Sequence, residues 1–190
     1  MSEVSFGGDG DFSDDRMIQK INTNLANELG NLCQRVLTLV FKNCDKAVPI
    51  EIGSYTEDDD AILNSARTLK ERCGIEISKQ AIHRYSYEMV AMVTEANVYI
   101  DRQAPWVLKK TDLKRMGTVL YVLMEVLRHV AILYQPLIPS SANKILDMLA
   151  VPDDERTFDH LESCEIKLGA PVCKPSALFP RIEAPETVDA

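Results

Sequence analysis

The chain has 190 residues, 46% of them hydrophobic and 26% charged, which suits one globular core, and no apolar run approaches the roughly 20 residues of a transmembrane helix. The net charge of −8 argues against a nucleic-acid partner when it is taken as a whole. Most of the acids, however, lie in residues 1–15, 47–60 and 151–190, which together carry −15, whereas residues 16–46 and 61–150 carry +7. Such a partner is therefore not excluded.

The first predicted helix covers about residues 14–43. Ser13 precedes it as a capping residue, and the next two residues are acids that favour a helix N-terminus. Its apolar residues recur on the helical period and form one stripe that we expect to face the core: Ile18, Ile21, Leu25, Leu29, Leu32, Val36 and Leu39.

Two more helices are predicted in the middle of the chain. Thr56 with Asp59 three residues later resembles a capping arrangement for the second helix, which we expect Gly74 to end. Apolar residues on the helical period predict a third helix from about Ser78, and Pro105 should close it.

A fourth helix should run from a Thr111 cap to about Gln135, and it is apolar nearly all round, as a central bundle helix is. Ser140 or Ser141 can cap a short fifth helix that continues through Met148. No alternating strand pattern is present. We therefore predict an all-α fold, an up-and-down bundle of about five helices.

Three segments organise the chain in this interpretation. Residues 13–150 form the helical bundle. Residues 1–12 are a Gly- and Asp-rich leading segment, and residues 151–190 are an irregular, Pro-rich and acidic C-terminal tail.

The polar side of the first helix predicts a binding face. Asn27, Asn31 and Arg35 follow at i, i+4 and i+8, so their side chains stand in one row, with Asn24 and Gln34 on the same side. An amide presents a donor and an acceptor, which matches the edge of an unpaired base, and an arginine suits phosphate or a base edge. The alternative is that these amides only decorate a solvated face.

Trp106, the only tryptophan, follows Pro105 where the third helix should end. It can serve as a stacking platform for a base, with Arg102, Lys109 and Lys110 nearby to meet the nucleic-acid backbone. The alternative is a packing residue at a helix end beside a solvated basic face. With the amide row, these residues favour a protein that binds a single-stranded RNA loop.

Four segments resemble one known family, the methionyl-tRNA synthetases, over almost the whole chain. Residues 27–35 resemble the family's N-x-L-G-N-L-x-x-R row, and residues 97–106 resemble its N-x-Y-I/V-D-x-Q-A-P-W segment. Residues 6–13 are similar to the family's lead into its anticodon-binding domain, and residues 178–182 to its C-terminal ending.

This resemblance implies a partner and a set of binding residues. The partner is the anticodon loop of tRNA(Met), with the sequence CAU. The resemblance assigns its recognition to Asn27, Asn31, Arg35 and Trp106, and we expect supporting RNA contacts from Asn24, Gln34, Arg102, Lys109 and Lys110.

Other residues are expected to be structural. Asn97, Tyr99 and Pro105 should shape the turn that presents the tryptophan. Glu125 and Arg128, spaced i,i+3, should form a pair within the bundle.

The resemblance also implies a parent enzyme, a class I methionine–tRNA ligase that uses ATP with Mg²⁺ and methionine. No segment of this chain resembles the H-I-G-H or K-M-S-K-S motifs that perform that chemistry. We therefore expect no catalytic residue and no cofactor in this chain, a missing catalytic domain as a further partner, and no aminoacylation by the chain alone.

Five cysteines, an odd number without a CxxC pair, predict free thiols rather than a disulfide framework. His160 and Cys164 stand at a metal-like i,i+4 spacing, with Cys173 further on, but three ligands without a second cluster give no reason to expect a metal site. The acidic N-terminus is unlike a secretory signal. We expect a cytoplasmic protein with no membrane contact, a mitochondrial or plastid location being the alternative.

Two other functions stay open from the sequence. The bundle of another class I synthetase, such as the leucyl, isoleucyl or cysteinyl enzyme, has the same architecture. A helical module that binds another protein would instead use Trp106 as an anchor.

Overall fold

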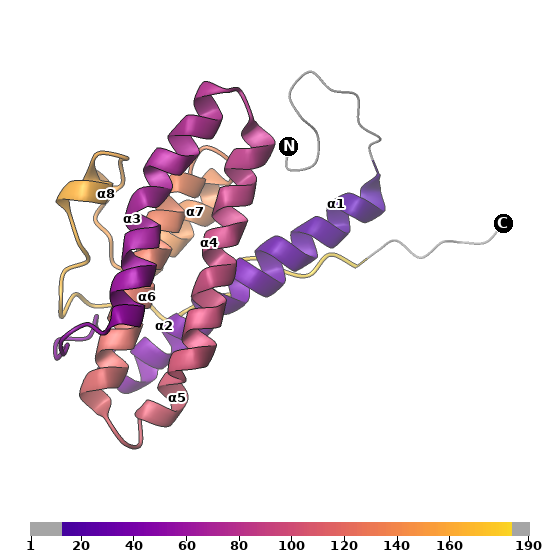
Figure 1. The fold of residues 1–190 in the computed structure, drawn as a ribbon. Coiled ribbons are helices and arrows are strands. Elements are labelled where there is room, and N and C mark those ends of the chain that lie inside the picture. Colours follow the sequence, from indigo (N-terminus) through magenta and orange to yellow (C-terminus); the bar gives the residue numbers. More distant parts are fainter. Residues whose placement is uncertain (1–12, 184–190) are drawn as a thin grey trace.

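Helices form the fold in the computed structural model, which describes residues 13–183 (Figure 1). The predicted all-α class is confirmed, and no strand is assigned within these residues. The elements in chain order are α1 (Asp14–Lys20), η1 (Ile21–Gly30), α2 (Asn31–Asn43), α3 (Glu57–Ser78), α4 (Ile82–Gln103), α5 (Pro105–Leu108), α6 (Leu113–Tyr134), α7 (Pro139–Met148), η2 (Asp153–Glu155) and α8 (His160–Ser163).

The first predicted helix is one continuous rod, but it has a π-helical segment, η1, between α1 and α2. Ser13 caps it, because its hydroxyl accepts a hydrogen bond from the Arg16 amide at 3.4 Å. The predicted apolar stripe is fully buried at Leu29, Leu32 and Val36, whereas its first residues, Ile18 and Ile21, and its last, Leu39, are only half-buried. For the first residues the reason is visible in Figure 1, where α1 projects beyond the other helices.

The α3–α4 hairpin packs beside α6. Thr56 and Asp59 form the predicted capping box at the start of α3. The expected stop at Gly74 is wrong, because Gly74 is an ordinary helical residue and α3 continues to Ser78. The chain reverses instead at Gln80, whose φ is +57°.

The central helix α6 is buried from Met116 to its end. Its cap is Asp112, not Thr111, because the Asp112 carboxylate accepts a hydrogen bond from the Arg115 amide at 2.8 Å. Among the described helices α6 alone is long and apolar enough to cross a membrane, yet its apolar window is entirely buried, as in a core helix. The expected serine cap of the next helix is also wrong, since Pro139 occupies the first position of α7.

The tail packs against the bundle and then returns along the first rod. The backbone of residues 169–172 pairs with residues 46–48, with bonds of 2.9 to 3.0 Å around an isolated bridge between Ala47 and Pro171. Leu161, Ile166 and Val172 are buried in the core. Beyond them the tail returns along the first rod (Figure 1), where its last described residues contact η1.

All five cysteines are free thiols. Within residues 13–183, no group of three or more His, Cys, Asp or Glu side chains is arranged to hold a metal ion. His160, Cys164 and Cys173 accordingly do not gather into a site.

Candidate nucleic-acid interface

Arg35 of α2 and Trp106 of α5 meet although 70 residues separate them. The Arg35 guanidinium carbon lies 5.1 Å from the centroid of the Trp106 ring, a cation–π contact. The same guanidinium is hydrogen-bonded to the Asp101 carboxylate near the end of α4. Trp106 keeps 37% of its surface exposed, so part of the ring is open to a ligand.

A sharp turn presents the tryptophan. Helix α4 ends at Gln103, and Ala104 adopts the left-handed conformation with φ +45° and ψ +58°. Pro105 is buried and supplies the first residue of α5, where its missing N–H costs no hydrogen bond. The Gln103 side chain accepts from Arg115 at 2.7 Å and donates to Asp58 at 3.0 Å, which fixes the end of α4.

Asp59 is the buried centre of the contacts behind this turn. Its carboxylate accepts hydrogen bonds from the Tyr99 hydroxyl, the Arg115 guanidinium and, at 2.8 Å, the Thr56 amide. Burial alone would raise the pKa of Asp59, but the bonds from Arg115, Thr56 and Tyr99 outweigh it and lower the pKa to about 2. Tyr99 therefore joins α4 to the start of α3.

Asn97 joins α4 to the π segment. Its amide donates to the Glu28 carboxylate at 3.0 Å and to the Val93 carbonyl at 3.1 Å. The Glu28 carbonyl is also within 3.4 Å of the same nitrogen. The Asn97 side chain thus fixes the position of η1 along α4, near the end of α4 that carries Asp101.

The predicted amide row is divided between two places. Asn27, Asn31 and Gln34 line an open groove of about 530 Å³, and the opposite wall is the tail segment around Phe179 and Arg181. Arg35 does not line this groove, because it turns toward Trp106.

Two further members of the predicted polar face behave differently. Asn24 is half-buried and lies outside the groove. The Gln34 amide donates to the Thr38 hydroxyl at 3.1 Å, so one of its hydrogens is already used on the helix surface.

The predicted basic residues also divide into two kinds. Arg102 is paired with Asp58 at 3.1 Å. Lys109 and Lys110 are exposed on the short loop after α5, and neither makes an ion pair within the described part of the chain. Both lysines are therefore available to interact with an anionic ligand.

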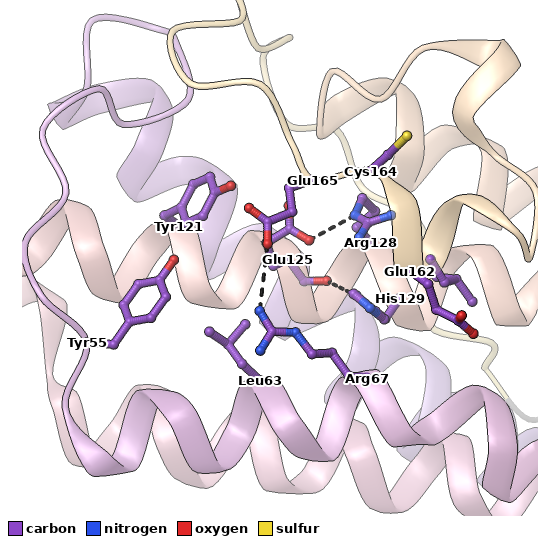
Figure 2. A pocket seen from close by; sticks show the side chains of 11 residues that line it. Tyr55, Leu63, Arg67, Tyr121, Glu125, Arg128, His129, Glu162, Cys164 and Glu165 are labelled. Carbon is purple, nitrogen blue, oxygen red and sulfur yellow. Dashed lines mark hydrogen bonds and ion pairs between the residues drawn. The ribbon is translucent and has the colours of Figure 1, made fainter.

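Glu125 and Arg128 lie elsewhere, at the contact of α6 with the tail (Figure 2). Both side chains are buried and form an ion pair at 2.9 Å. Glu125 also accepts from the Ile166 amide, and Arg128 donates to the His160 carbonyl at 3.1 Å. Burial raises the pKa of Glu125 even though Arg128 opposes that effect.

A polar cavity of about 180 Å³ adjoins this pair, and Figure 2 shows the Tyr55 and Tyr121 side chains at one end of it. Its inner wall includes His129, whose pKa burial lowers to about 4. The Nδ1 atom of His129 is 2.9 Å from the Glu125 carbonyl. The cavity shares no lining residue with the Arg35–Trp106 contact, and its polar contacts join the tail to α6.

Sequence reasoning missed several residues of the interface. Asp101 stands inside the segment that resembles the known family, but nothing in its spacing indicates that it binds Arg35. Asp59 was interpreted only as a helix cap. Arg181 and Asn22 were not singled out, because their contacts join residues about 150 to 160 positions apart.

Comparison with known proteins decides the family. A family model described as the anticodon binding domain of methionyl tRNA ligase matches residues 48–189. The chain belongs to this family. The predicted resemblance to the methionyl-tRNA synthetases is thus confirmed, in preference to the other class I synthetases.

Relatives in the methionyl-tRNA ligase family cover nearly all of the chain. It is 48% identical over 187 residues to the methionine–tRNA ligase of Rhizobium meliloti, covering 98% of this chain and 36% of the relative. The enzyme of Brucella suis is 46% identical, with the same two shares. The chain therefore spans about a third of the length of these curated relatives.

Solved structures of the family have the same fold. The apo methionyl-tRNA synthetase of Mycobacterium tuberculosis superposes with a TM-score of 0.92 at 41% identity, covering 96% of this chain and 37% of that one. The same enzyme in complex with methionyl-adenylate gives a TM-score of 0.90 at 42% identity, with shares of 94% and 36%.

Proposed function

We propose that this chain reads the CAU anticodon of tRNA(Met) as part of a methionine–tRNA ligase. The observation that carries the proposal is the contact between Arg35 and Trp106, which brings the two most characteristic segments of the sequence into one exposed place. ATP with Mg²⁺ and methionine are assigned to the remaining part of such a ligase, and the cytoplasm is its proposed location.

The mechanism is recognition without chemistry. One anticodon base stacks on the open part of Trp106, and the Arg35 guanidinium, oriented by Asp101, offers its remaining donors to a base edge or phosphate. Asn27 and Asn31 offer amide groups to neighbouring nucleotides in the groove. Lys109 and Lys110 meet the RNA backbone, and Asn24, Gln34 and Arg102 support these contacts.

The single tryptophan makes this proposal directly testable, because its fluorescence reports on the proposed stacking site alone. The purified chain is titrated with anticodon stem-loops carrying CAU or single-base changes, at low and moderate salt. We expect CAU to bind most tightly, to change the emission of Trp106, and to bind more weakly as salt rises.

Replacing Trp106 by Ala should remove most of the preference for CAU, read by filter binding, and leave the helical circular dichroism unchanged. Tyr87→Ala is the matched control, since Tyr87 is an exposed aromatic residue near the start of α4, at the other end of that helix. Normal CAU preference in the Trp106 variant would exclude the stacking role. Salt-independent binding of a protein partner, with no preference among loops, would favour an interaction module.

A further inference from the structure

Most cations near Trp106 are already neutralised. Arg35 is paired with Asp101, Arg102 with Asp58, and Arg115 with the buried Asp59. A guanidinium that is shared with a carboxylate attracts an RNA phosphate less strongly than an unpaired one. Phosphate contacts on this face must therefore come largely from other cations.

Arg181 is such a cation, and it lies on the wall of the groove that faces Asn27 and Asn31. It is exposed, and no carboxylate pairs with it among residues 13–183. Its guanidinium donates to the Asn27 amide oxygen at 3.4 Å. Because this acceptor is neutral, it orients the guanidinium without cancelling the charge.

The C-terminal strap, residues 177–182, is held in place beside the π segment. The Asn22 amide donates to the Ile182 carbonyl at 2.9 Å, and its oxygen accepts from the Ile182 amide at 2.9 Å. Phe179 packs against Gly30 so closely that a Cβ there would lie 3.3 Å from its ring. The strap is therefore a defined wall and gives Arg181 a defined position.

We propose that the C-terminal strap is one wall of the anticodon groove and that Arg181 binds a phosphate of the RNA. The inference rests on the proposed function and extends its binding site. Asn27 and Arg35 are eight residues apart, which is roughly 12 Å along the rod at the α-helical rise. An RNA loop stacked on Trp106 therefore has neighbouring phosphates within reach of Arg181.

Arg181→Gln and Arg181→Lys test the proposal by filter binding over a range of salt concentrations. A phosphate contact carries no sequence information, so Arg181→Gln should weaken CAU and altered loops alike, by about fivefold at low salt. The slope of log affinity against log salt should become shallower by about 0.7 to 0.9. Arg181→Lys should retain most of both. Lys174→Gln, an exposed tail cation outside the groove, should change neither.

Asn22→Ala tests whether the strap must be held. It should weaken RNA binding by a factor similar to that of Arg181→Gln, and combining the two should weaken it little further. Hydrogen exchange should show that the Ile182 amide loses protection in this variant while α6 keeps its own. Additive losses in the double variant would contradict a positioning role for Asn22.

The outcomes separate this inference from the proposed function. Unchanged affinity and salt slope in Arg181→Gln overturn the phosphate contact even where the CAU preference is intact. A loss confined to CAU overturns it too, because the residue would then read a base. If the unaltered chain binds all loops equally, the proposed function fails, whereas a shallower slope in Arg181→Gln would still support the phosphate contact.

Discussion

Arg35 contacts Asp101 and Trp106, and the exposure of these contacts decides how much stability the protein should lose when Arg35 is replaced. The Arg35 side chain is 28% exposed and Asp101 is 63% exposed, so water screens their ion pair. Arg35→Gln should therefore lower the free energy of unfolding by at most about 1 kcal/mol, including the contact with Trp106. RNA affinity should fall at least about tenfold, because the Arg35 guanidinium, a charged donor of two parallel hydrogen bonds, is lost from the proposed RNA-binding surface.

Urea unfolding and stem-loop binding of the same variant measure the two effects. Lys70→Gln is the matched control, since Lys70 forms an ion pair of similar exposure with Glu162 at 3.0 Å and is not one of the proposed RNA contacts. A variant of Arg35 that unfolds, or that binds RNA as tightly as the Lys70 variant, would show that Arg35 is a structural residue.

Asp59 makes the free energy of unfolding depend on pH in the acidic range. Its pKa is about 2 in the folded protein, below the ordinary value of 3.8, so ionised Asp59 stabilises the fold fully above pH 4. That contribution, about 2 kcal/mol, is lost as the pH falls from 4 toward 2. The unfolding free energies of the natural chain and of Asp59→Asn should therefore converge in acid.

Urea titrations between pH 6 and pH 2.5 measure this convergence. Asp60→Asn is the control, because Asp60 is an exposed acid in the same helical turn. A constant difference between Asp59→Asn and the natural chain at all pH values would mean that the buried carboxylate is not ionised.

At the residue level the sequence predicts which side chains form the candidate site, but it does not predict how they are paired. The spacing of Asn27, Asn31 and Arg35 predicts one row, because it follows from helix geometry alone. The turn of Arg35 away from that row follows from Asp101, which is 66 residues distant in the chain. Such a partner depends on the tertiary packing of two helices, about which a local pattern carries no information.

At the level of elements, the π segment η1 is the least expected feature. A Cβ on Gly30 would lie 3.1 Å from the Leu25 carbonyl and 3.3 Å from Phe179, both tighter than ordinary contacts. Gly74, in contrast, has nothing within 4 Å of such an atom. Gly74→Ala should stabilise the protein by about 0.5 to 1 kcal/mol through helix propensity, whereas Gly30→Ala should not.

Thermal and urea unfolding of the two alanine variants provide the comparison. Amide hydrogen exchange at the strap residues that pack on η1 should also become faster in the Gly30→Ala variant. Equal stabilisation by both substitutions would mean that η1 and the strap adapt without cost.

Helix existence followed from the sequence better than helix ends did. Capping at Ser13 and Thr56 was predicted because a cap uses neighbouring residues. The predicted stop at Gly74 failed because glycine only weakens a helix, and packing against α4 and α6 supports α3 through it. The π segment is not predicted, because the apolar stripe is judged on the α-helical period throughout residues 14–43.

On the scale of the whole molecule, buried polar groups fasten the tail to the bundle. Arg128→Met leaves the buried Glu125 without its cation and removes the bond to the His160 carbonyl. It should lower the free energy of unfolding by about 3 to 5 kcal/mol, the usual cost of breaking a buried ion pair. Trp106 fluorescence and circular dichroism should still report one transition, because tail and bundle share a core.

Arg67→Met is the matched control. Arg67 faces Glu165 at 3.7 Å (Figure 2). Both side chains are more than half exposed, so the loss of Arg67 should lower the free energy of unfolding by no more than about 0.5 kcal/mol. Limited proteolysis of the two variants then shows which part of the chain becomes more accessible to cleavage. Cleavage confined to the tail in Arg128→Met, with an unchanged bundle transition, would show that the two parts unfold independently.

Sequence reasoning places the candidate site on two segments that the bundle brings together, but it does not include the C-terminal strap in that site. The resemblance supplied Trp106 and the amide row, and the bundle brought Trp106 to Arg35. The sequence predicts the C-terminal strap only as part of an irregular, Pro-rich and acidic tail. Its position depends on Asn22 and Gly30, whose roles appear only when distant segments are packed together.

The left-handed turn at Ala104 implies that the conformational entropy of the Trp106 segment is lost on folding rather than on binding. A left-handed backbone is costly for any residue other than glycine, so the turn persists only because its surroundings hold it there. In the proposed function, a base that stacks on Trp106 meets a residue whose backbone is already fixed by this turn. Less conformational entropy is lost on association, so a small contact area can discriminate between bases without first organising its own platform.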